Sequence, residues 1–323
     1  MIYFIYLITF ILIQLIYFRI ADKLNIIDKP NERSSHSTVT IRGGGFIFYV
    51  AVLFFFIFSH FQYPWFLGGL TLISLISFAD DVQPQTYKFR LFIHFISMLL
   101  LFYQWNLFSF PWYYTAVSLV LCIGIINAYN FMDGINGITG GYSLVVIASL
   151  WYINNYQILF VDNRLLYLVA LSLISFNLFN FRKKAKCFAG DVGAISIAFI
   201  IIFITGLLIF KTGEISFIVL LVVYGVDTVL TIIHRIILKE NIFDAHRKHL
   251  YQLMANEMKM PQLSVSLIYS GIQVLILCGF YLINIDKKLY VFLVVIFLSA
   301  IYYVLKKKYF HLHTIENRTS TSD

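Results

Sequence analysis

Two adjacent carboxylates that follow a long apolar run are the first side chains of this sequence suited to chemistry. Asp80 and Asp81 stand at the end of the run that begins near residue 65. Neighbouring residues on a helix point about 100° apart, so both carboxylates can face one site only if the helix ends there. One of them could then bind a metal ion or act as a base while the other orients it. The alternative is an ordinary acidic pair that terminates a helix.

A polar repeat with a spacing of three residues follows a second apolar run. It consists of Asn127, Asn130, Asp133 and Asn136. This spacing predicts a stripe of amide and carboxylate groups along one face of a helix. Gly134, inside the repeat, lets the backbone approach a ligand closely. Hydrogen bonding between helices by the asparagines is the alternative.

Asp191 lies in Gly190-Asp191-Val192-Gly193, between a basic run and another long apolar run. A simple role as helix N-cap is one interpretation. The other is a Mg²⁺ ligand, because magnesium typically takes one or two protein carboxylates together with phosphate oxygens of a substrate. Several carboxylates on one face would repel a phosphate-bearing substrate unless a cation lay between them. We therefore predict that Asp191 binds Mg²⁺, for which Mn²⁺ could substitute. Asp80 or Asp81 is the second ligand that this prediction allows.

Histidines beside basic residues form a further cluster in the segment Asp244-Ala-His246-Arg247-Lys248-His249-Leu-Tyr251-Gln252. Such residues suit contacts to a phosphate or diphosphate. Zinc is a poor fit, because the two histidines have no cysteine nearby. A basic helix lying against anionic lipid headgroups is the alternative.

Arg42 precedes three glycines that open the apolar run from residue 46. The backbone N–H groups of Gly43 to Gly45 could face an anion at a helix N-terminus. A flexible hinge beside a basic residue is the competing interpretation.

Farther along the chain, Asp227 is an acid inside an apolar run. We expect it to pair with Arg235 or His234, and a role in the site is the alternative.

Long apolar runs must position all of these residues. The chain of 323 residues is 60% hydrophobic and 12% charged, which departs strongly from the composition of soluble domains. Polar breaks divide it into about eleven apolar segments near the length that a bilayer requires. The sequence thus predicts an all-α, polytopic membrane helix bundle of 10 to 11 transmembrane helices, with one catalytic domain over residues 1–305 and a short cytoplasmic tail over 306–323.

The distribution of basic residues predicts an orientation. Counted over alternate inter-helix segments, 20 of the 24 Lys and Arg residues fall on one side, and the other side has only Arg164, Lys211, Lys287 and Lys288. The positive-inside rule makes the first side cytoplasmic and the N-terminus external. The net charge of +8 is then mainly a topology signal, and a nucleic-acid partner is not expected. The three cysteines indicate neither a disulfide framework nor a metal cluster.

In this order, the motifs over residues 28–252 resemble those of the polyprenyl-phosphate N-acetylhexosamine-1-phosphate transferases. The resemblance rests on Arg42 with its glycines, on Asp80-Asp81, on Asn130-Phe-Met-Asp133-Gly134-Ile-Asn136-Gly137 and on Gly190-Asp191-Val192-Gly193. It implies that Asp191 binds magnesium, that the acidic pair is essential and that Asn130 and Asp133 lie in a nucleotide pocket. Arg90 stands where relatives often carry a basic residue.

Two departures indicate a subgroup. Many relatives have a His-x-His-His cluster, of which only His249 matches here, followed by Tyr251 and Gln252. Asn136 also stands where the peptidoglycan branch often has a carboxylate. Both features resemble the subgroup that begins O-antigen or other surface polysaccharides.

The predicted reaction moves N-acetylhexosamine 1-phosphate from a UDP-sugar to undecaprenyl phosphate, at the cytoplasmic face of the inner membrane. The predicted partners are UDP-N-acetylhexosamine, undecaprenyl phosphate, membrane lipid and a second copy of the chain as a homodimer. We assign catalytic roles to Asp80, Asp81 and His249, and the metal to Asp191. Substrate contacts are assigned to Arg42, Arg90, Asn127, Asn130, Asp133, Gly134, Asn136, His246 and Arg247.

Two other functions fit parts of the pattern. An ion-coupled secondary transporter also uses acids and asparagines in glycine-broken helices, but its site should lie near mid-membrane. An intramembrane aspartyl protease would need two acids facing each other within the bilayer, and it leaves the asparagine repeat without a role.

Overall fold

Helices make up nearly all of the structure, a computed structural model that describes residues 2–28, 39–241 and 246–319, with side chains through Tyr309. Twelve α-helices lie in these described ranges, and eleven of them have twelve residues or more. The long helices are α1 (Ile2–Lys23), α2 (Ile47–Phe58), α3 (Pro64–Val82), α4 (Tyr87–Gln104), α5 (Trp112–Met132), α6 (Ile138–Tyr156), α7 (Asn163–Asn180), α8 (Gly190–Thr212), α9 (Val222–Ile237), α11 (Gln262–Leu282) and α12 (Lys287–Thr319). The short helix α10 covers Leu250–Gln252.

Within the described residues, seven helical segments are long and apolar enough to cross a membrane. They comprise α1, α3, α5, α8, α9 with the turn before it, α11 and α12 up to Tyr309, and a shorter apolar helix spans Gly44–Phe58. The prediction of a polytopic all-α membrane protein is therefore confirmed. Helix α12 continues past residue 305, where we expect a tail, as far as Thr319.

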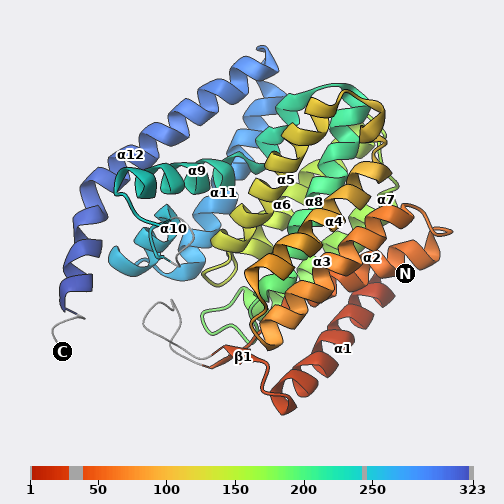
Figure 1. Cartoon of the computed structure of the whole chain (residues 1–323), viewed down its shortest axis with the longest axis horizontal. Helices are drawn as coiled ribbons and strands as arrows, with labels where there is room; N and C mark the ends of the chain where they lie inside the picture. The colour runs from red at the N-terminus through yellow and green to blue at the C-terminus, as the bar shows by residue number, and fades with distance from the viewer. Residues whose placement is uncertain (1, 29–38, 242–245, 320–323) are drawn as a thin grey trace.

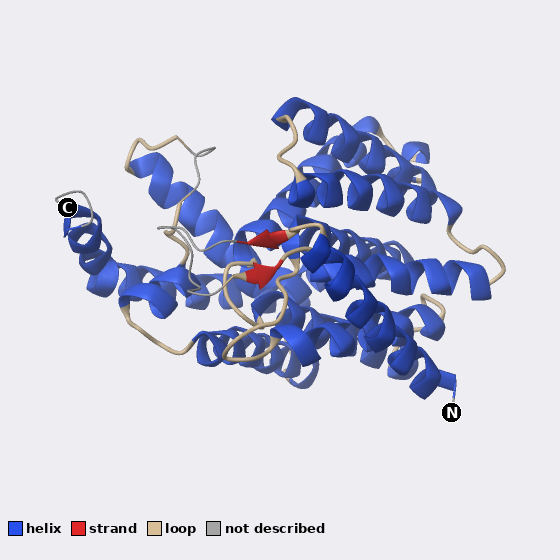
Figure 2. Cartoon of the chain, turned by 90° about the horizontal axis from the view of Figure 1, so that it is seen from below, coloured by secondary structure: helices blue, strands red, loops and turns tan. Residues whose placement is uncertain are grey.

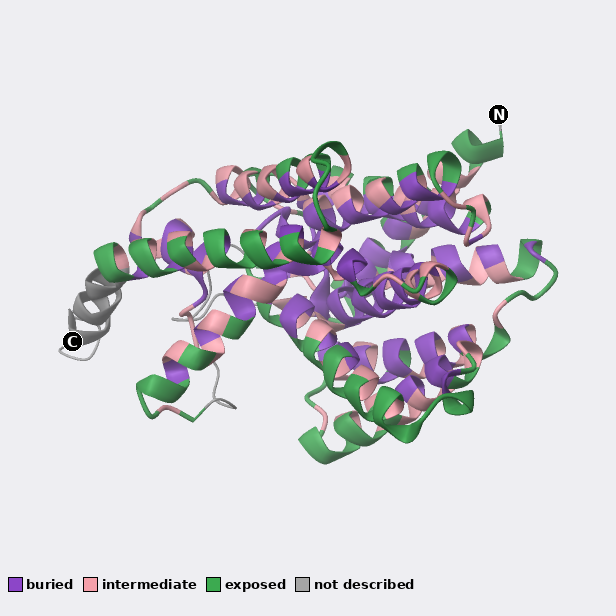
Figure 3. Ribbon diagram, turned by 90° about the horizontal axis from the view of Figure 1, so that it is seen from above, coloured by how far each residue is buried: buried purple, intermediate pink, exposed green. Residues whose placement is uncertain are grey.

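Helix α8 forms the centre of the bundle. Its sequence is apolar on every side, as is typical of a helix surrounded by other helices. In its most apolar stretch, 89% of the residues are buried. Helices α3 and α5 pack directly against it, and α4 packs on α3. Figure 1 shows α8 among the central helices and α12 along an outer edge, and Figure 3 shows buried residues concentrated in the middle of the bundle.

A small sheet joins the beginning of the chain to the start of α8. Strand β1 (Ile27–Asp28) pairs antiparallel with β2 (Thr40–Ile41), and Ile41 also bridges to Cys187. Figure 2 shows the two strands side by side, and Figure 1 shows β1 at the lower edge of the helices. The sheet therefore brings Asp28 and Arg42 beside the segment that leads into Asp191.

Candidate active site

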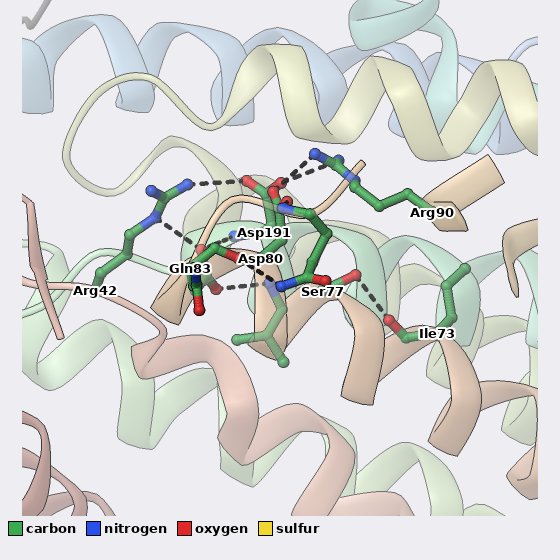
Figure 4. Close-up of polar contacts among 10 residues, drawn as sticks. Arg42, Ile73, Ser77, Asp80, Gln83, Arg90 and Asp191 are labelled. Carbon is green, nitrogen blue, oxygen red and sulfur yellow. Dashed lines mark hydrogen bonds and ion pairs between the residues drawn. The ribbon is translucent and has the colours of Figure 1, made fainter. Parts of the chain in front are cut away.

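Two arginines and three aspartates form an ion-pair cluster where α3 ends and α8 begins. Arg42 Nε lies 2.7 Å from Asp81 Oδ1, and Arg42 Nη2 lies 3.3 Å from Asp191 Oδ1. Arg90, in the first turn of α4, contacts Asp80 Oδ2 at 2.7 Å through Nη1 and Asp191 Oδ2 at 3.1 Å through Nη2. Figure 4 shows the two guanidinium groups on either side of Asp191. Asp191 is thus shared by both arginines.

Asp81 binds the first turn of α8. Its Oδ1 accepts the backbone N–H of Asp191 at 2.9 Å, and its Oδ2 accepts that of Val192 at 3.0 Å. The first N–H groups of a helix have no partner within the helix, and a carboxylate there also meets the positive end of the helix dipole. The α8 N-terminus is therefore capped by a residue of α3, and Asp191 is a first-turn residue, not the N-cap.

The two acids of the pair differ in access. The Asp81 side chain has 0% exposure, whereas 11% of the Asp80 side chain and 15% of the Asp191 side chain are exposed. Asp80 accepts the Gln85 backbone N–H and the Arg90 guanidinium. Asp80 and Asp191 are therefore the carboxylates of the cluster that are open to a ligand.

The carboxylates also act on Arg42. Burial disfavours its charged form, but the charges of Asp81 and Asp191 outweigh burial and raise the pKa of Arg42 above its ordinary value. Arg42 thus stays charged at neutral pH.

A polar cavity of about 260 Å³ opens beside this cluster. Arg42 and Asp191 belong to both the cluster and the cavity wall. The lining also includes Asp28, Asn130, Asp133, Gly134, Ile135, Asn136, Asn180, Phe188, Gly190, Gln252 and Gln262. Residues from the ends of α5 and α7 and from the starts of α8 and α11 thus share one cavity.

The loop after α5 carries much of the cavity wall. Helix α5 ends at Met132, so Asp133 and Asn136 lie in a loop and the prediction of one continuous helical stripe is wrong. Asn136 anchors this loop because its Nδ2 donates to the Arg182 carbonyl at 2.9 Å, while its backbone N–H donates to Gln262 Oε1 at 3.1 Å. Burial raises the pKa of Asp133 to about 6, with a smaller contribution in the same direction from Asp191.

Asp80, Asp81 and Arg90 belong to the ion-pair cluster but do not line the cavity. Three other predicted site residues belong neither to the cluster nor to the cavity wall. Asn127 is exposed on α5, and neither it nor Arg247 lines the cavity. His246 stacks on His249 with ring centroids 5.0 Å apart, and neither ring lines the cavity. Burial is the main cause that lowers the pKa of His246 to about 3, and nearby positive charges lower it further. The ring is therefore neutral at neutral pH. Asp244 of the same motif lies outside the described residues.

His249 is a fourth such residue, because its side chain is buried beside Asp227. Its Nδ1 lies 3.4 Å from Asp227 Oδ1. The prediction that Asp227 pairs with Arg235 or His234 is wrong, since Arg235 contacts Glu240 instead. The helix pattern could not reveal this pairing because His249 reaches Asp227 from another segment of the chain.

Two of the three glycines after Arg42 use their N–H groups in backbone hydrogen bonds, so these groups do not face an anion. The N–H of Gly44 donates to the Phe188 carbonyl at 2.8 Å, and that of Gly45 donates to the Ala189 carbonyl at 3.1 Å. A Cβ atom on Gly45 would lie 2.3 Å from Gly193 Cα, so only glycine permits this approach. These glycines position the α8 N-terminus.

Several residues of the cavity wall do not stand out in the sequence. Asn180 accepts the Gly137 N–H at 2.8 Å and donates to the Cys187 carbonyl at 2.9 Å, which holds two loops together. Gln262 and Phe188 also line the cavity. The one available signal for Asn180 was a polar residue at the end of an apolar run.

The oxygen donors at this site fit magnesium. No group of three His, Cys, Asp or Glu side chains able to hold a metal occurs in the described part of the chain. Mg²⁺ needs only one or two protein carboxylates when substrate phosphates and water complete its ligands. The three carboxylates of the cluster also exceed its two guanidinium groups by one negative charge. Asp191 and Asp80 are therefore suitable ligands.

Known proteins are similar to this chain over the range that carries these motifs. The family model described as glycosyl transferase family 4 matches residues 63–209, a range that includes Asp80, Asp81, Asp133 and Asp191. A probable undecaprenyl-phosphate N-acetylglucosaminyl 1-phosphate transferase of Bacillus subtilis is 25% identical over 288 residues, which cover 81% of this chain and 79% of the relative.

Two further relatives have nearly the same name, undecaprenyl-phosphate alpha-N-acetylglucosaminyl 1-phosphate transferase. The protein of Thermotoga maritima is 23% identical over 73% of this chain and 75% of its own length. The protein of Escherichia coli K12 is 26% identical over 58% of this chain and 56% of its own length. The motifs and these matches agree: residues 63–209 of the chain match glycosyl transferase family 4, and the chain is similar to undecaprenyl-phosphate N-acetylglucosaminyl 1-phosphate transferases.

Proposed function

We propose that this chain transfers N-acetylhexosamine 1-phosphate from a UDP-sugar to undecaprenyl phosphate. The products are UMP and an undecaprenyl diphosphate-linked sugar. N-acetylglucosamine is the first sugar to test, because the three relatives carry it in their names. The observation that carries the proposal is that Asp191 belongs both to the ion-pair cluster and to the wall of the cavity.

The reaction requires one bond to form and one to break. An oxygen of the lipid phosphate attacks the β-phosphorus of the UDP-sugar, and the bond from that phosphorus to the oxygen bridging it to the α-phosphorus breaks. UMP leaves with the electron pair of that bond. Such phosphoryl transfers depend mainly on positioning and on electrostatic stabilisation. Arg42 and Arg90, already held beside Asp191, supply positive charge next to the proposed diphosphate position.

The carboxylates divide the remaining tasks. Asp191, with Asp80, would hold Mg²⁺ together with substrate phosphate oxygens, and the bound ion neutralises charge that develops on the leaving group. Asp80 also orients the lipid phosphate or accepts its proton, because its carboxylate is partly open. Asp81 keeps the α8 N-terminus in place.

The proposed substrates define where the reaction takes place. A water-soluble nucleotide sugar and a lipid phosphate meet only at a membrane surface, and the acid cluster lies at helix ends, not near mid-helix as a transporter site would. The excess of basic residues on this side supports the cytoplasmic face of the inner membrane. We place the reaction at the first membrane step of O-antigen or another envelope polysaccharide, such as a lipopolysaccharide. A homodimer stays a prediction.

A reconstituted assay tests this proposal. Purified protein is incubated with undecaprenyl phosphate, Mg²⁺ and radiolabelled UDP-N-acetylglucosamine or UDP-N-acetylgalactosamine, and UMP and labelled lipid are measured. We expect labelled lipid with at least one sugar, dependent on the metal and lost in Asp191→Asn, whereas Asp162→Asn, in an exposed ion pair with Arg164, retains activity. No lipid product from either sugar would contradict the proposed reaction, and full activity with chelator or in Asp191→Asn would contradict the metal site.

A further inference from the structure

A buried carboxylate outside the acid cluster collects hydrogen bonds from three helices. Asp227 on α9 is 3% exposed. Its carboxylate accepts the Tyr269 hydroxyl of α11 at 2.6 Å and the Thr231 hydroxyl of α9 at 3.1 Å. It also accepts the backbone N–H groups of Leu250 at 2.9 Å and Tyr251 at 3.4 Å, both in α10. Asp227 therefore fixes the start of α10 to the bundle.

Helix α10 cannot hold this position alone. It has three residues and continues directly into a π-helical turn at Leu253–Glu257, and a helical segment this short is not stable without tertiary contacts. A charge buried away from water is also costly unless hydrogen bonds compensate it. The contacts of Asp227 meet both requirements, because the first N–H groups of α10 gain an acceptor and the carboxylate gains donors.

The segment that Asp227 holds, His249 to Gln252, reaches the cavity at two points. Gln252 lines the cavity, and its Oε1 accepts the His249 backbone N–H at 3.2 Å. The Tyr251 hydroxyl donates to the Phe131 carbonyl at 2.8 Å, directly before the loop that carries Asp133. A Cβ atom on Gly134 would lie 2.1 Å from this hydroxyl oxygen, so the Tyr251 ring and the loop are in close contact.

We propose that Asp227 is a positioning residue for the nucleotide-sugar cavity, acting through the segment His249 to Gln252. This inference rests on the proposed function. Asp227 does not itself line the cavity, but it fixes a segment that supplies one wall residue and supports the loop that supplies others. Loss of this anchor moves Gln252 and the Asp133 loop relative to Asp191, and small displacements of positioning groups have large kinetic effects.

The test separates positioning from general stability. Asp227→Asn is compared with Tyr269→Phe, which removes one hydrogen bond to the same carboxylate, and with Asp162→Asn at a distant ion pair. We expect Asp227→Asn to raise the KM for the UDP-sugar about 10-fold or more, with a smaller effect on the KM for undecaprenyl phosphate. Tyr269→Phe should change the same constant in the same direction by about threefold. A merely structural defect would lower the amount of active enzyme and leave KM unchanged.

A double-mutant cycle tests the route of the effect. If Asp227 acts through Gln252, then Gln252→Ala should cost much less when added to Asp227→Asn than when added to the wild type. If Asp227→Asn does not fold, the same cycle is carried out with Tyr269→Phe. Additive losses, or a KM equal to that of Asp162→Asn, would overturn the inference. Failure of the wild type to make lipid product would instead contradict the proposed function.

Discussion

Adjacent acids of the cluster have different environments. Asp81 accepts two backbone N–H groups of α8 and the Arg42 guanidinium, and its side chain is closed to solvent. Asp80 accepts one backbone N–H and the Arg90 guanidinium, and part of it is exposed. We infer that Asp81 acts mainly on the fold of the site and Asp80 mainly on its chemistry.

Asparagine substitutions at the two positions should therefore differ. Loss of a helix-capping acceptor typically costs about 0.5–2 kcal/mol, and the Asp81 carboxylate accepts two N–H groups of α8, so Asp81→Asn should lower the thermal unfolding midpoint as well as activity. Asp80→Asn should lower kcat by about 100-fold or more with a much smaller change in the midpoint. Thermal unfolding in detergent and the lipid-product assay measure both quantities. Equal midpoints for the two variants would contradict the division of roles.

The carboxyl group of Asp133 predicts a pH dependence of stability. Its pKa is raised to about 6 by burial, whereas an unfolded chain has an aspartate pKa of about 3.9. The folded state therefore binds this proton more tightly, and its contribution to the free energy of unfolding is greatest below pH ~4 and falls as the pH rises through 6. The pKa difference corresponds to about 3 kcal/mol.

Asp133→Asn removes this titration. We expect the free energy of unfolding of the wild type, relative to the variant, to decrease between about pH 4 and 6 and to level off above that range. Denaturant unfolding of both proteins in detergent across this range provides the measurement. A constant difference between them would show that Asp133 titrates at its ordinary pKa.

At the scale of elements, the site depends on how closely α8 approaches the segment before α2. The backbone of Gly44 and Gly45 bonds to the residues that lead into α8, and Gly45 meets Gly193 without space for a side chain. Arg42 lies directly before these glycines and Asp191 at the start of α8. The distance between the two segments therefore sets the contact between Arg42 and Asp191.

Gly45→Ala should disturb this contact. The added Cβ would lie 2.3 Å from a backbone atom, which cannot move aside as a flexible side chain can. Overpacking of this kind costs about 1–3 kcal/mol, and we expect lower stability together with lower activity. Gly124→Ala in α5 is the matched control, since a Cβ there has no neighbour within 4 Å. Similar unfolding midpoints for the two variants would show that the segments can separate freely.

At the scale of the molecule, short connections between antiparallel helices gather the motifs. Helices α3, α5 and α7 end at the same side where α4, α6, α8 and α11 begin, as the contacts of Asp81 with Asp191 and of Asn136 with Arg182 require. Figure 1 shows the successive helices arranged side by side. The exposed basic loop over residues 182–186 lies at this side, and Arg164 lies at the other end of α7.

Thiol labelling tests the orientation. In a Cys278→Ser background, which removes the exposed native cysteine, Lys184→Cys and Arg164→Cys are treated with a membrane-impermeant maleimide in spheroplasts. We expect Arg164→Cys to react from outside and Lys184→Cys to react only after the membrane is opened. The reverse pattern would place the site on the external face.

The sequence by itself determined the number and type of the elements and the side on which the motifs meet. The length and apolar character of each run are local properties, and helices satisfy their own backbone hydrogen bonds in lipid. The about eleven apolar segments of the sequence therefore agree with the eleven long helices in the described part of the chain. Because successive helices run in opposite directions, Asp80, Asp133 and Asp191 then lie at the same end of the helix bundle.

Only the tertiary structure decided which of these residues face one another. The rotation of each helix about its axis and the exact end of α5 depend on packing between distant segments, which no local pattern specifies. For that reason Asn127 lies outside the cavity, Asp81 caps α8, and Asp227 holds α10 in place of pairing with Arg235. Each of these contacts joins segments that are far apart in the chain and close only once the bundle has formed.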